Sequence, residues 1–389
     1  MDDPDVSAMV GGTIKPKLLF LVTEDWYFRS HRLPIARAAR VRGFDVVIAT
    51  HVQDHEELIR REGFKLIPIR LSRKSRNPLQ EVLAIVDLIE IYRKERPDIV
   101  HHVAMKPVLY GSIAAHLAGI PYIVNALAGM GYVFTSNHLQ AKLIRPFIKM
   151  AFAFLLGGNN TLTIVQNPDD FNLLQSIVSE KSLVIIKGSG VDTGDFKPSP
   201  NKEVTPVVLM ASRMLWDKGV GEFVAAAKIL QQEGVAARFV LVGDIDHDNP
   251  SAVPAAKLKE WHDGKVVEYW GHRKNMLEVF QGAHIACLPS YREGLPKVLL
   301  EAAACGLPIV TTDTPGCREI VRDQINGLLV PVKDIKALAL ALKNLIMNHA
   351  LRLRMGERGR TIVENEFSLE KVVDETISLY NNLLQTRGR

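Results

Sequence analysis

Two glutamates, Glu293 and Glu301, stand eight positions apart in the stretch "EGLPKVLLEAAACGLPIVTTD". Glu293 precedes a Gly–Leu–Pro turn. Glu301 lies in an apolar segment that we expect to be a helix starting at Pro296, a residue suited to the first helical position. A buried carboxylate is costly unless it has a partner or access to solvent. Sugar or ribose hydroxyls would supply donors, whereas the plainer alternative pairs Glu301 with an arginine or a backbone amide.

Two cations lie upstream, in the stretch "SRMLWDKGVGEF". Arg213 ends a predicted strand, Lys218 follows five residues later, and Gly219 opens onto a predicted helix. Cations beside a helix N-terminus form an anion site, because the free N–H groups and the helix dipole add to their field. The alternative is an ordinary pair of surface cations near a loop.

Length and composition limit the class of protein. A chain of 389 residues is too long for one ordinary core, which predicts two domains. No apolar run approaches the roughly 18 residues of a membrane-spanning helix. The first residues are acidic, unlike the start of a signal peptide, and we expect 1–14 to be a disordered lead-in. Three separated cysteines without zinc-ligand spacing predict reduced thiols in a cytoplasmic protein. The net charge of +5 fits phosphorylated ligands or anionic lipid and gives no reason to expect nucleic acid.

Strand and helix patterns alternate in two successive series. Continuous apolar runs indicate strands buried on both faces, as in parallel sheets; they fall at 17–24, 45–50, 98–103 and 122–127, and again at 207–214, 237–244, 266–271, 284–290 and 308–313. We therefore predict an α/β protein with two Rossmann-like domains facing each other across a cleft, and C-terminal helices packing back across the junction. The predicted segments are a first domain at 15–194, a linker at 195–206, a second domain at 207–365 and a C-terminal helix at 366–389.

Ligands of open α/β sheets bind at the carboxyl ends of strands, which singles out three stretches of the first domain. "TEDWYFRSHRLP" carries a histidine and an arginine at a helix start, "VHHVAMKP" carries adjacent histidines and a lysine, and "NALAGMGYVF" supplies a glycine-rich loop that lets the backbone approach a ligand. Neighbouring strand residues face opposite sides, so only one of the two histidines can face the cleft. The candidate ligand-contacting residues of these stretches are His31, Arg32, His101, His102, Lys106, Gly129 and Gly131.

Several of these motifs, in this order, resemble one known family. "EGLPKVLLE", "SRMLWDKG", "GSGVD" and "NGLLVP" resemble the retaining GT-B glycosyltransferases of the family 4 type (glycosyl transferases group 1). "SHR" is similar to a bacterial subgroup linked to surface polysaccharides and lipid-linked oligosaccharides. The resemblance covers nearly the whole chain. Many relatives carry a glycine-rich loop after the first strand, and this sequence has none there.

The resemblance implies a role for each motif residue. Arg213 and Lys218 would hold the donor diphosphate and stabilise the departing nucleotide. Glu301 would accept hydrogen bonds from the ribose. Glu293 would hold the transferred sugar, together with the backbone at Gly294, Leu295 and Pro296. The resemblance leads us to take Glu293, Lys218, His101 and His102 as the catalytic set, since the family has a histidine near this position that contacts the donor sugar. The acceptor side would be formed by His31, Arg32, Lys106, Gly129 and Gly131.

Asp244 and Asp246 form an Asp-x-Asp, a pattern that binds a metal in another glycosyltransferase fold. Here it follows a central strand of the second domain, where the resembled family has a glycine–acid loop and no metal. We therefore expect no metal and no cofactor, because fixed cations can meet the charge of a leaving diphosphate.

A basic stripe marks the predicted helix at 138–156: His138, Lys142, Arg145 and Lys149 recur at steps of four, three and four. Most of the remaining residues are apolar. One interpretation is an element lying on an anionic membrane surface, with 70–76 as additional cationic surface. The other is a core helix with a solvated basic edge.

These observations favour a retaining, metal-independent glycosyltransferase. Its donor would be a UDP-linked hexose or N-acetylhexosamine, and its acceptor a polysaccharide precursor such as a polyprenyl-diphosphate-linked sugar. The location would be the cytoplasm or the inner face of the membrane. Two alternatives stay open: a nucleotide-sugar epimerase of the same fold, and a non-catalytic protein that binds nucleotide sugars.

Overall fold

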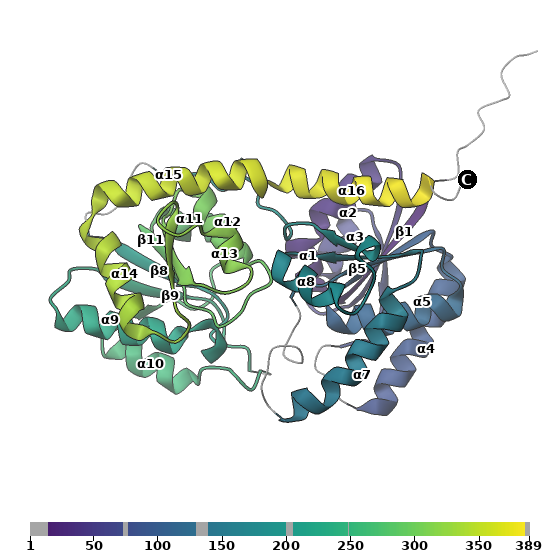
Figure 1. Cartoon of the computed structure of the whole chain (residues 1–389), viewed down its shortest axis with the longest axis horizontal. Helices are drawn as coiled ribbons and strands as arrows, with labels where there is room; N and C mark the ends of the chain where they lie inside the picture. Colours follow the sequence, from purple (N-terminus) through teal and green to yellow (C-terminus); the bar gives the residue numbers. More distant parts are fainter. Residues whose placement is uncertain (1–14, 73–76, 130–138, 200–204, 248, 386–389) are drawn as a thin grey trace, which may run out of the picture. The chain divides into compact units, whose positions relative to one another are not determined.

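The computed structural model describes residues 15–72, 77–129, 139–199, 205–247 and 249–385 (Figure 1). The chain divides into two compact units, one up to Val124 and one from Asn125 onward. The predicted lead-in, Gly131 and His138 lie outside the described residues. None of the described helices has the length and apolar character needed to cross a bilayer.

The first sheet has the strand order β3-β2-β1-β4-β5-β6-β7. Its strands are β1 (Lys17–Glu24), β2 (Asp45–His51), β3 (Lys65–Pro68), β4 (Ile99–Val103), β5 (Tyr122–Ala126), β6 (Thr161–Val165) and β7 (Leu183–Ile185). The connecting helices are α1 (Asp25–His31), α2 (Leu33–Val41), α3 (Glu56–Arg61), α4 (Pro78–Glu95), the π-helical turn η1 (Pro107–Gly111), α5 (Ser112–Ala118), α7 (Leu139–Leu156), α8 (Pro168–Gln175) and η2 (Glu180–Ser182).

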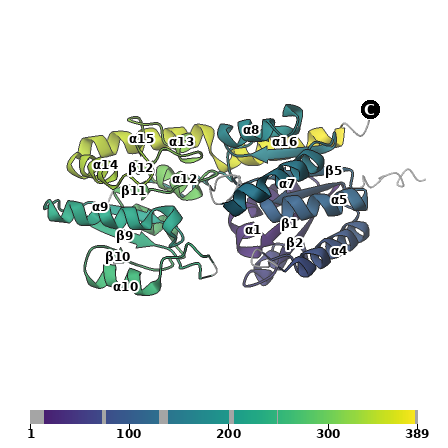
Figure 2. The same ribbon diagram turned by 60° about the horizontal axis from the view of Figure 1, so that its bottom comes forward.

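Side-chain alternation along β1 and β4 builds the core of the first unit. Leu19 and Leu21 of β1 join Val100 of β4 in a buried cluster with Leu88 and Tyr92 of α4. Helices α4 and α5 pack on each other over this face (Figure 2). Residues on alternate positions of the same strands therefore point to the opposite face.

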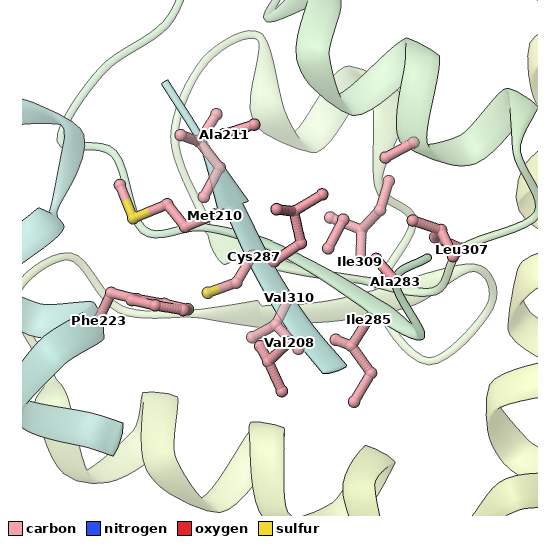
Figure 3. Close-up of a cluster of buried hydrophobic side chains, with 14 of the residues drawn as sticks. Val208, Met210, Ala211, Phe223, Ala283, Ile285, Cys287, Leu307, Ile309 and Val310 are labelled. Atoms are coloured by element: carbon pink, nitrogen blue, oxygen red, sulfur yellow. The ribbon is translucent and has the colours of Figure 1, made fainter. Parts of the chain in front are cut away.

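The second sheet has the order β10-β9-β8-β11-β12-β13. Its strands are β8 (Val207–Ala211), β9 (Arg238–Val242), β10 (Glu268–Tyr269), β11 (Ile285–Leu288), β12 (Ile309–Thr312) and β13 (Gly327–Val330). Its helices are η3 (Trp216–Lys218), α9 (Val220–Gln232), α10 (Ala255–Asp263), α11 (Met276–Gln281), α12 (Lys297–Ala304), α13 (Cys317–Ile320), α14 (Ile335–Met347), α15 (His349–Glu366) and α16 (Leu369–Gln385). Central strands carry buried side chains such as Val208, Met210 and Cys287, which meet Phe223 of α9 (Figure 3).

Two parallel, doubly wound sheets confirm the predicted fold class. In each sheet the chain starts at a central strand and later returns to that strand's other side, so the order reverses between β1 and β4 and between β8 and β11. Loops at the carboxyl ends of such strand pairs flank a topological switch point, where open α/β sheets bind ligands. Arg213 and Lys218 follow β8, and Glu293 follows β11.

The last helix, α16, packs along the edge of the first sheet. Leu379 and Leu383 line an apolar hollow of about 620 Å³ with Leu162 of β6 and Ile185 of β7. A backbone bridge between Val191 and Ser368 holds the start of α16 beside the segment that leaves β7. The predicted return of the C-terminal helices is therefore confirmed, while the exact domain boundaries stay predictions.

Candidate active site

Gly219 fixes the loop between β8 and α9. Its φ of +80° is left-handed, and a Cβ built there would lie 2.1 Å from the carbonyl oxygen of Pro289, the residue just after β11. Only glycine allows this approach. The loops are also joined by Tyr291 N donating to Asp217 O at 2.9 Å. The β8 and β11 loops are thus held together, which brings Lys218 to the Glu293 turn.

Lys218 and Glu293 form a close ion pair. Lys218 Nζ lies 2.5 Å from Glu293 Oε1, and the two side chains are only 21% and 11% exposed. Burial strengthens such a pair relative to one in bulk water, because the effective dielectric constant is lower. Both charges affect the nearby thiol of Cys317. Burial, followed by Glu293, raises the pKa of this thiol to about 12, and Lys218 acts to lower it.

Arg213 is oriented by Asp246, the second acid of the Asp-x-Asp for which the sequence predicted no metal. Arg213 NH1 donates to Asp246 Oδ2 at 2.7 Å. The other half of the Asp-x-Asp, Asp244, faces His272, with 3.0 Å between Oδ2 and Nδ1. Within the described ranges, no three histidines, cysteines or acidic residues gather as a metal-binding group. Asp246 therefore serves as the partner of Arg213.

Glu301 sits in the second turn of α12 and is largely buried. Burial raises the pKa of its carboxyl, and Lys297, with its Nζ 3.4 Å away, opposes this rise. The alternative interpretation named an arginine or a backbone amide as the partner of Glu301, and the cation that the structure places beside it is the intrahelical Lys297. The prediction for Pro296 was wrong by one position, because α12 starts at Lys297 and Pro296 is its N-cap with extended backbone.

Gly294 is packed so closely that no side chain fits. A Cβ there would lie 2.4 Å from the carbonyl oxygen of Ala128, and a Cβ on Gly316 would lie 2.2 Å from Gly294 O. Asn167 Nδ2 donates a hydrogen bond to the carbonyl oxygen of Gly294 at 2.8 Å. A Cβ on Gly129 would come within 3.4 Å of Gly294 Cα, so the predicted glycine loop meets the Glu293 turn. Leu295 points into the core.

A buried hydrogen-bond network holds Arg292 and Gly294, the residues on either side of Glu293. Arg292 NH2 donates to Asp170 Oδ1 at 2.8 Å, and Asn167 Nδ2 lies 3.1 Å from Asp170 Oδ2. Asp170 and Asn167 are essentially fully buried. Because Asn167 also binds Gly294, the residues on either side of Glu293 are anchored to the start of α8, which limits how the Glu293 carboxylate can turn.

The adjacent histidines of β4 face opposite sides of the first sheet. His102 packs under the helices: Tyr92 OH lies 3.0 Å from Nε2, and Ser112 Oγ lies 3.4 Å from Nδ1. His101 stacks on Phe20 with ring centroids 5.1 Å apart. Burial, then Arg32 and His102, lower the pKa of His101 well below its usual range, so its ring is neutral. These contacts assign His102 to packing and leave His101 as the candidate.

The other first-unit candidates differ in burial. His31 is half-buried and stacks on Tyr27 at 4.1 Å. Lys106 Nζ donates to Glu81 Oε1 at 2.8 Å and to Ser72 O at 3.0 Å. Arg32, between α1 and α2, is buried with 4% of its surface exposed.

Comparisons with known proteins identify the family. Residues 17–167 match the family model described as Glycosyl transferase 4-like, and residues 192–362 match that of Glycosyl transferases group 1. The N,N'-diacetylbacillosaminyl-diphospho-undecaprenol alpha-1,3-N-acetylgalactosaminyltransferase of Campylobacter jejuni is 31% identical, over 84% of this chain and 88% of that protein. The chain belongs to the group 1 glycosyltransferases. Its enzyme class is therefore glycosyltransferase.

One further relative and one solved structure of similar fold are informative for this glycosyltransferase. The UDP-Gal:alpha-D-GlcNAc-diphosphoundecaprenol alpha-1,3-galactosyltransferase of Escherichia coli is 25% identical over 79% of the chain and 81% of that protein. Sucrose-phosphate synthase from Thermosynechococcus elongatus superposes with a TM-score of 0.80 at 20% identity, over 96% of this chain and all of that one. The glycosyltransferase has the GT-B fold.

Two residues at the site of this glycosyltransferase were not predicted, Asp170 and Arg292. The pairing of Asp246 with Arg213 was not predicted either. The stretch "QNPDD" does carry a signal, since Asn167 before Pro168 is a typical helix N-cap. Nothing in the stretch indicates that the cap residue also binds Gly294, 127 positions away.

Proposed function

We propose that this glycosyltransferase is a retaining, metal-independent enzyme. It moves a hexose or N-acetylhexosamine from a UDP-sugar to a polyprenyl-diphosphate-linked acceptor. The observation that carries the proposal is the meeting of Lys218 and Glu293 at the switch point of the second sheet. The Lys218 ammonium suits a diphosphate, and the Glu293 carboxylate suits sugar hydroxyls. The two side chains are adjacent, and so are the diphosphate and the sugar of a nucleotide sugar.

The chemistry follows from the charges. The bond between the anomeric carbon and the diphosphate oxygen breaks, and a bond to the acceptor oxygen forms. Lys218 and Arg213 stabilise the negative charge that develops on the leaving UDP. A phosphate oxygen takes the acceptor's proton on the face that the leaving group vacates, which gives retention. Glu301 accepts hydrogen bonds from the ribose, and Glu293 from the sugar.

The lipid-linked acceptor is supported by the relatives and by α7. The names of the two curated relatives given above both include an undecaprenol diphosphate. On α7, large apolar side chains face solvent: Phe147, Met150 and Phe154 are 68%, 67% and 77% exposed. Arg145 and Lys149 lie on the same helix. This exposure disfavours the core-helix interpretation and fits a helix that rests on an anionic membrane surface.

In the first unit we assign the acceptor side to His31, Arg32 and Lys106, with neutral His101 as the histidine that contacts sugar. Gly129 contributes through the close approach of its backbone to Gly294.

A panel of UDP- and GDP-sugars, each incubated with the enzyme in the presence and absence of EDTA, tests the proposal. We expect one UDP-sugar to be hydrolysed slowly without acceptor and transferred rapidly with a polyprenyl-diphosphate sugar, equally with and without EDTA. Product with an inverted anomeric configuration, or activity lost with EDTA, would contradict the retaining or metal-independent part. Conversion of the sugar without release of UDP would indicate an epimerase.

A further inference from the structure

Arg32 is a buried cation at the junction of α1 and α2. It follows β1 and α1, serves as the N-cap of α2, and has 4% of its surface exposed. Its backbone N–H donates to Phe28 O at 2.8 Å. Among the described residues, the guanidinium makes no hydrogen bond or ion pair, and its Nε is fully enclosed. Burying a charged group without such compensation costs several kcal/mol.

A second buried arginine shows how this fold normally compensates such a charge. Arg352 of α15 is 8% exposed, and its NH1 donates to Leu345 O at 2.8 Å and to Ile346 O at 2.7 Å. These carbonyls belong to the C-terminal end of α14, whose dipole favours a cation. Arg352 is thus a structural arginine, and Arg32 has no equivalent partners in the described part of the chain.

The carboxylates nearest to Arg32 in sequence are engaged elsewhere. Asp25 is fully buried and accepts from the backbone N–H groups of Gln53 at 2.8 Å and His55 at 2.9 Å. Glu24 Oε2 accepts from Gln53 Nε2 at 3.2 Å. Both acids therefore connect the junction of β1 and α1 to the loop after β2.

Two groups whose pKa the charge of Arg32 affects, His101 and Tyr27, carry no negative charge. His101 is neutral because burial and then Arg32 lower its pKa. Burial raises the pKa of Tyr27, and Arg32 opposes this rise, so the phenol also stays neutral. The first turn of α2 has no side-chain cap, and it adds the positive end of a nine-residue helix at the same residue.

From this burial and lack of partners we infer that Arg32 binds a phosphoryl group of a diphosphate substrate. The inference rests on the proposed function, in which both the nucleotide sugar and the lipid-linked acceptor carry a diphosphate. A guanidinium binds a phosphate through two parallel hydrogen bonds, and burial strengthens this contact.

Thermal stability distinguishes a binding arginine from a structural one. In Arg32→Met, removing an uncompensated buried charge should raise the Tm of the full-length protein, by about 2 °C for each kcal/mol gained. The matched control, Arg352→Met, should lower the Tm, because it leaves two carbonyls without their donor. Inorganic pyrophosphate should raise the Tm of the wild type and of Arg352→Met, and should raise that of Arg32→Met clearly less. A lower Tm for Arg32→Met with an unreduced pyrophosphate response would overturn the inference.

Steady-state kinetics then separate the two sources of the phosphoryl group. If the acceptor supplies it, Arg32→Met raises the KM for the lipid-linked acceptor by about tenfold or more, the loss of one charge-assisted bond, and leaves the KM for the UDP-sugar unchanged. If the donor supplies it, the pattern reverses. Arg32→Lys should recover part of the loss, since it keeps the charge. Unchanged KM values for both substrates would overturn the inference. Absence of any transfer by the wild type would instead reject the proposed function, and pyrophosphate binding would still test Arg32.

Discussion

Lys218 Nζ lies 2.5 Å from Glu293 Oε1, so the cation assigned to the diphosphate and the carboxylate assigned to the sugar are each other's partners. A diphosphate that takes Lys218 must compete with this carboxylate. Once displaced, Glu293 is available to sugar hydroxyls. If the proposed roles are correct, we therefore expect diphosphate binding and sugar recognition to be coupled through this ion pair.

Replacing Glu293 with glutamine should separate these two effects. Glu293→Gln removes the competitor for Lys218, so UDP should bind about five- to tenfold more tightly, as expected for one charged contact. Sugar transfer should fall about 100-fold, because the carboxylate that holds the sugar is lost. Calorimetry with UDP and a transfer assay measure the two effects. Glu301→Gln is the control, since Glu301 is paired with Lys297, and it should not tighten UDP binding. Unchanged or weaker UDP binding by Glu293→Gln would contradict the coupling.

The close approach of Gly219 to Pro289 should make the loop between β8 and α9 intolerant of a side chain at position 219. In Gly219→Ala the new methyl group would lie 2.1 Å from the carbonyl oxygen of Pro289, so the loop must move and carry Lys218 away. We expect a loss of about 2–4 kcal/mol in the free energy of unfolding and a clear weakening of UDP binding. Gly234→Ala is a matched control, with a similar φ of +71° and no atom within 4 Å. It should cost about 1 kcal/mol and leave UDP binding intact. Equal losses in the two variants would show that backbone strain alone matters.

The sequence was sufficient to predict the architecture, and it indicated where the candidate cations and carboxylates of the site would lie, while the roles of these residues stay predictions. Apolar runs mark parallel strands, and the carboxyl ends of those strands are where loops converge, so Arg213, Lys218 and Glu293 could be placed near one another without coordinates. The pairing between side chains could not be predicted. Lys218 pairs with Glu293, which lies 75 positions later in the sequence. This pairing depends on loop conformations that Gly219 and Gly294 allow.

The two histidines show a similar limit. Strand alternation predicts that His101 and His102 face opposite sides, but the identity of the packing histidine depends on Tyr92 and Ser112, which lie on helices before and after β4. The exposure of the apolar side chains of α7 could likewise not be predicted from the sequence, because a basic stripe on an apolar helix fits both a core helix and a surface helix.

Asp170 should support catalysis by holding Arg292 in place. Asp170→Asn keeps the shape but removes the buried charge that pairs with Arg292, 2.8 Å away. Because the pair anchors the residue before Glu293, we expect kcat to fall about tenfold while UDP affinity stays within about twofold. Asp169→Asn is the neighbouring control, since the pair of Asp169 with Arg318 is 3.4 Å long and more exposed, and such pairs contribute little. An equal loss of kcat in both variants, or a loss confined to KM, would contradict a positioning role.

Glu301 should make stability depend on pH in the sense opposite to an ordinary ion-paired acid. Burial raises the pKa of its carboxyl in the folded state. The contribution of Glu301 to the free energy of unfolding is therefore complete below the usual carboxyl range, and it is lost as the pH rises through the raised pKa. Glu301→Gln imitates the neutral form. Urea unfolding should therefore show a gain over the wild type that grows from pH 4 to pH 8.

Glu268 provides the control of opposite sign. The hydrogen bond from Arg238 lowers the pKa of Glu268, so its stabilising contribution is present above the usual carboxyl range and is lost as the pH falls. Glu268→Gln should lose stability relative to the wild type, and the loss should be larger at pH 8 than at pH 4. A Glu301→Gln gain that is the same at both pH values would mean that packing, and not ionisation, is responsible.

The exposed apolar side chains of α7 should contribute to membrane binding. Phe147 and Phe154 are 68% and 77% exposed, and burying a phenylalanine side chain in lipid contributes about 1.5–3 kcal/mol. The double substitution Phe147→Ser and Phe154→Ser should therefore reduce sedimentation with phosphatidylglycerol vesicles by more than about tenfold. Lys149→Glu should reduce it further on anionic vesicles and have little effect on neutral ones, because the lysine acts through surface charge. Leu340→Ser, on a 70% exposed position of α14, is the control and should sediment like the wild type. If the double variant sediments normally while retaining its fold, α7 is not the element that binds the membrane.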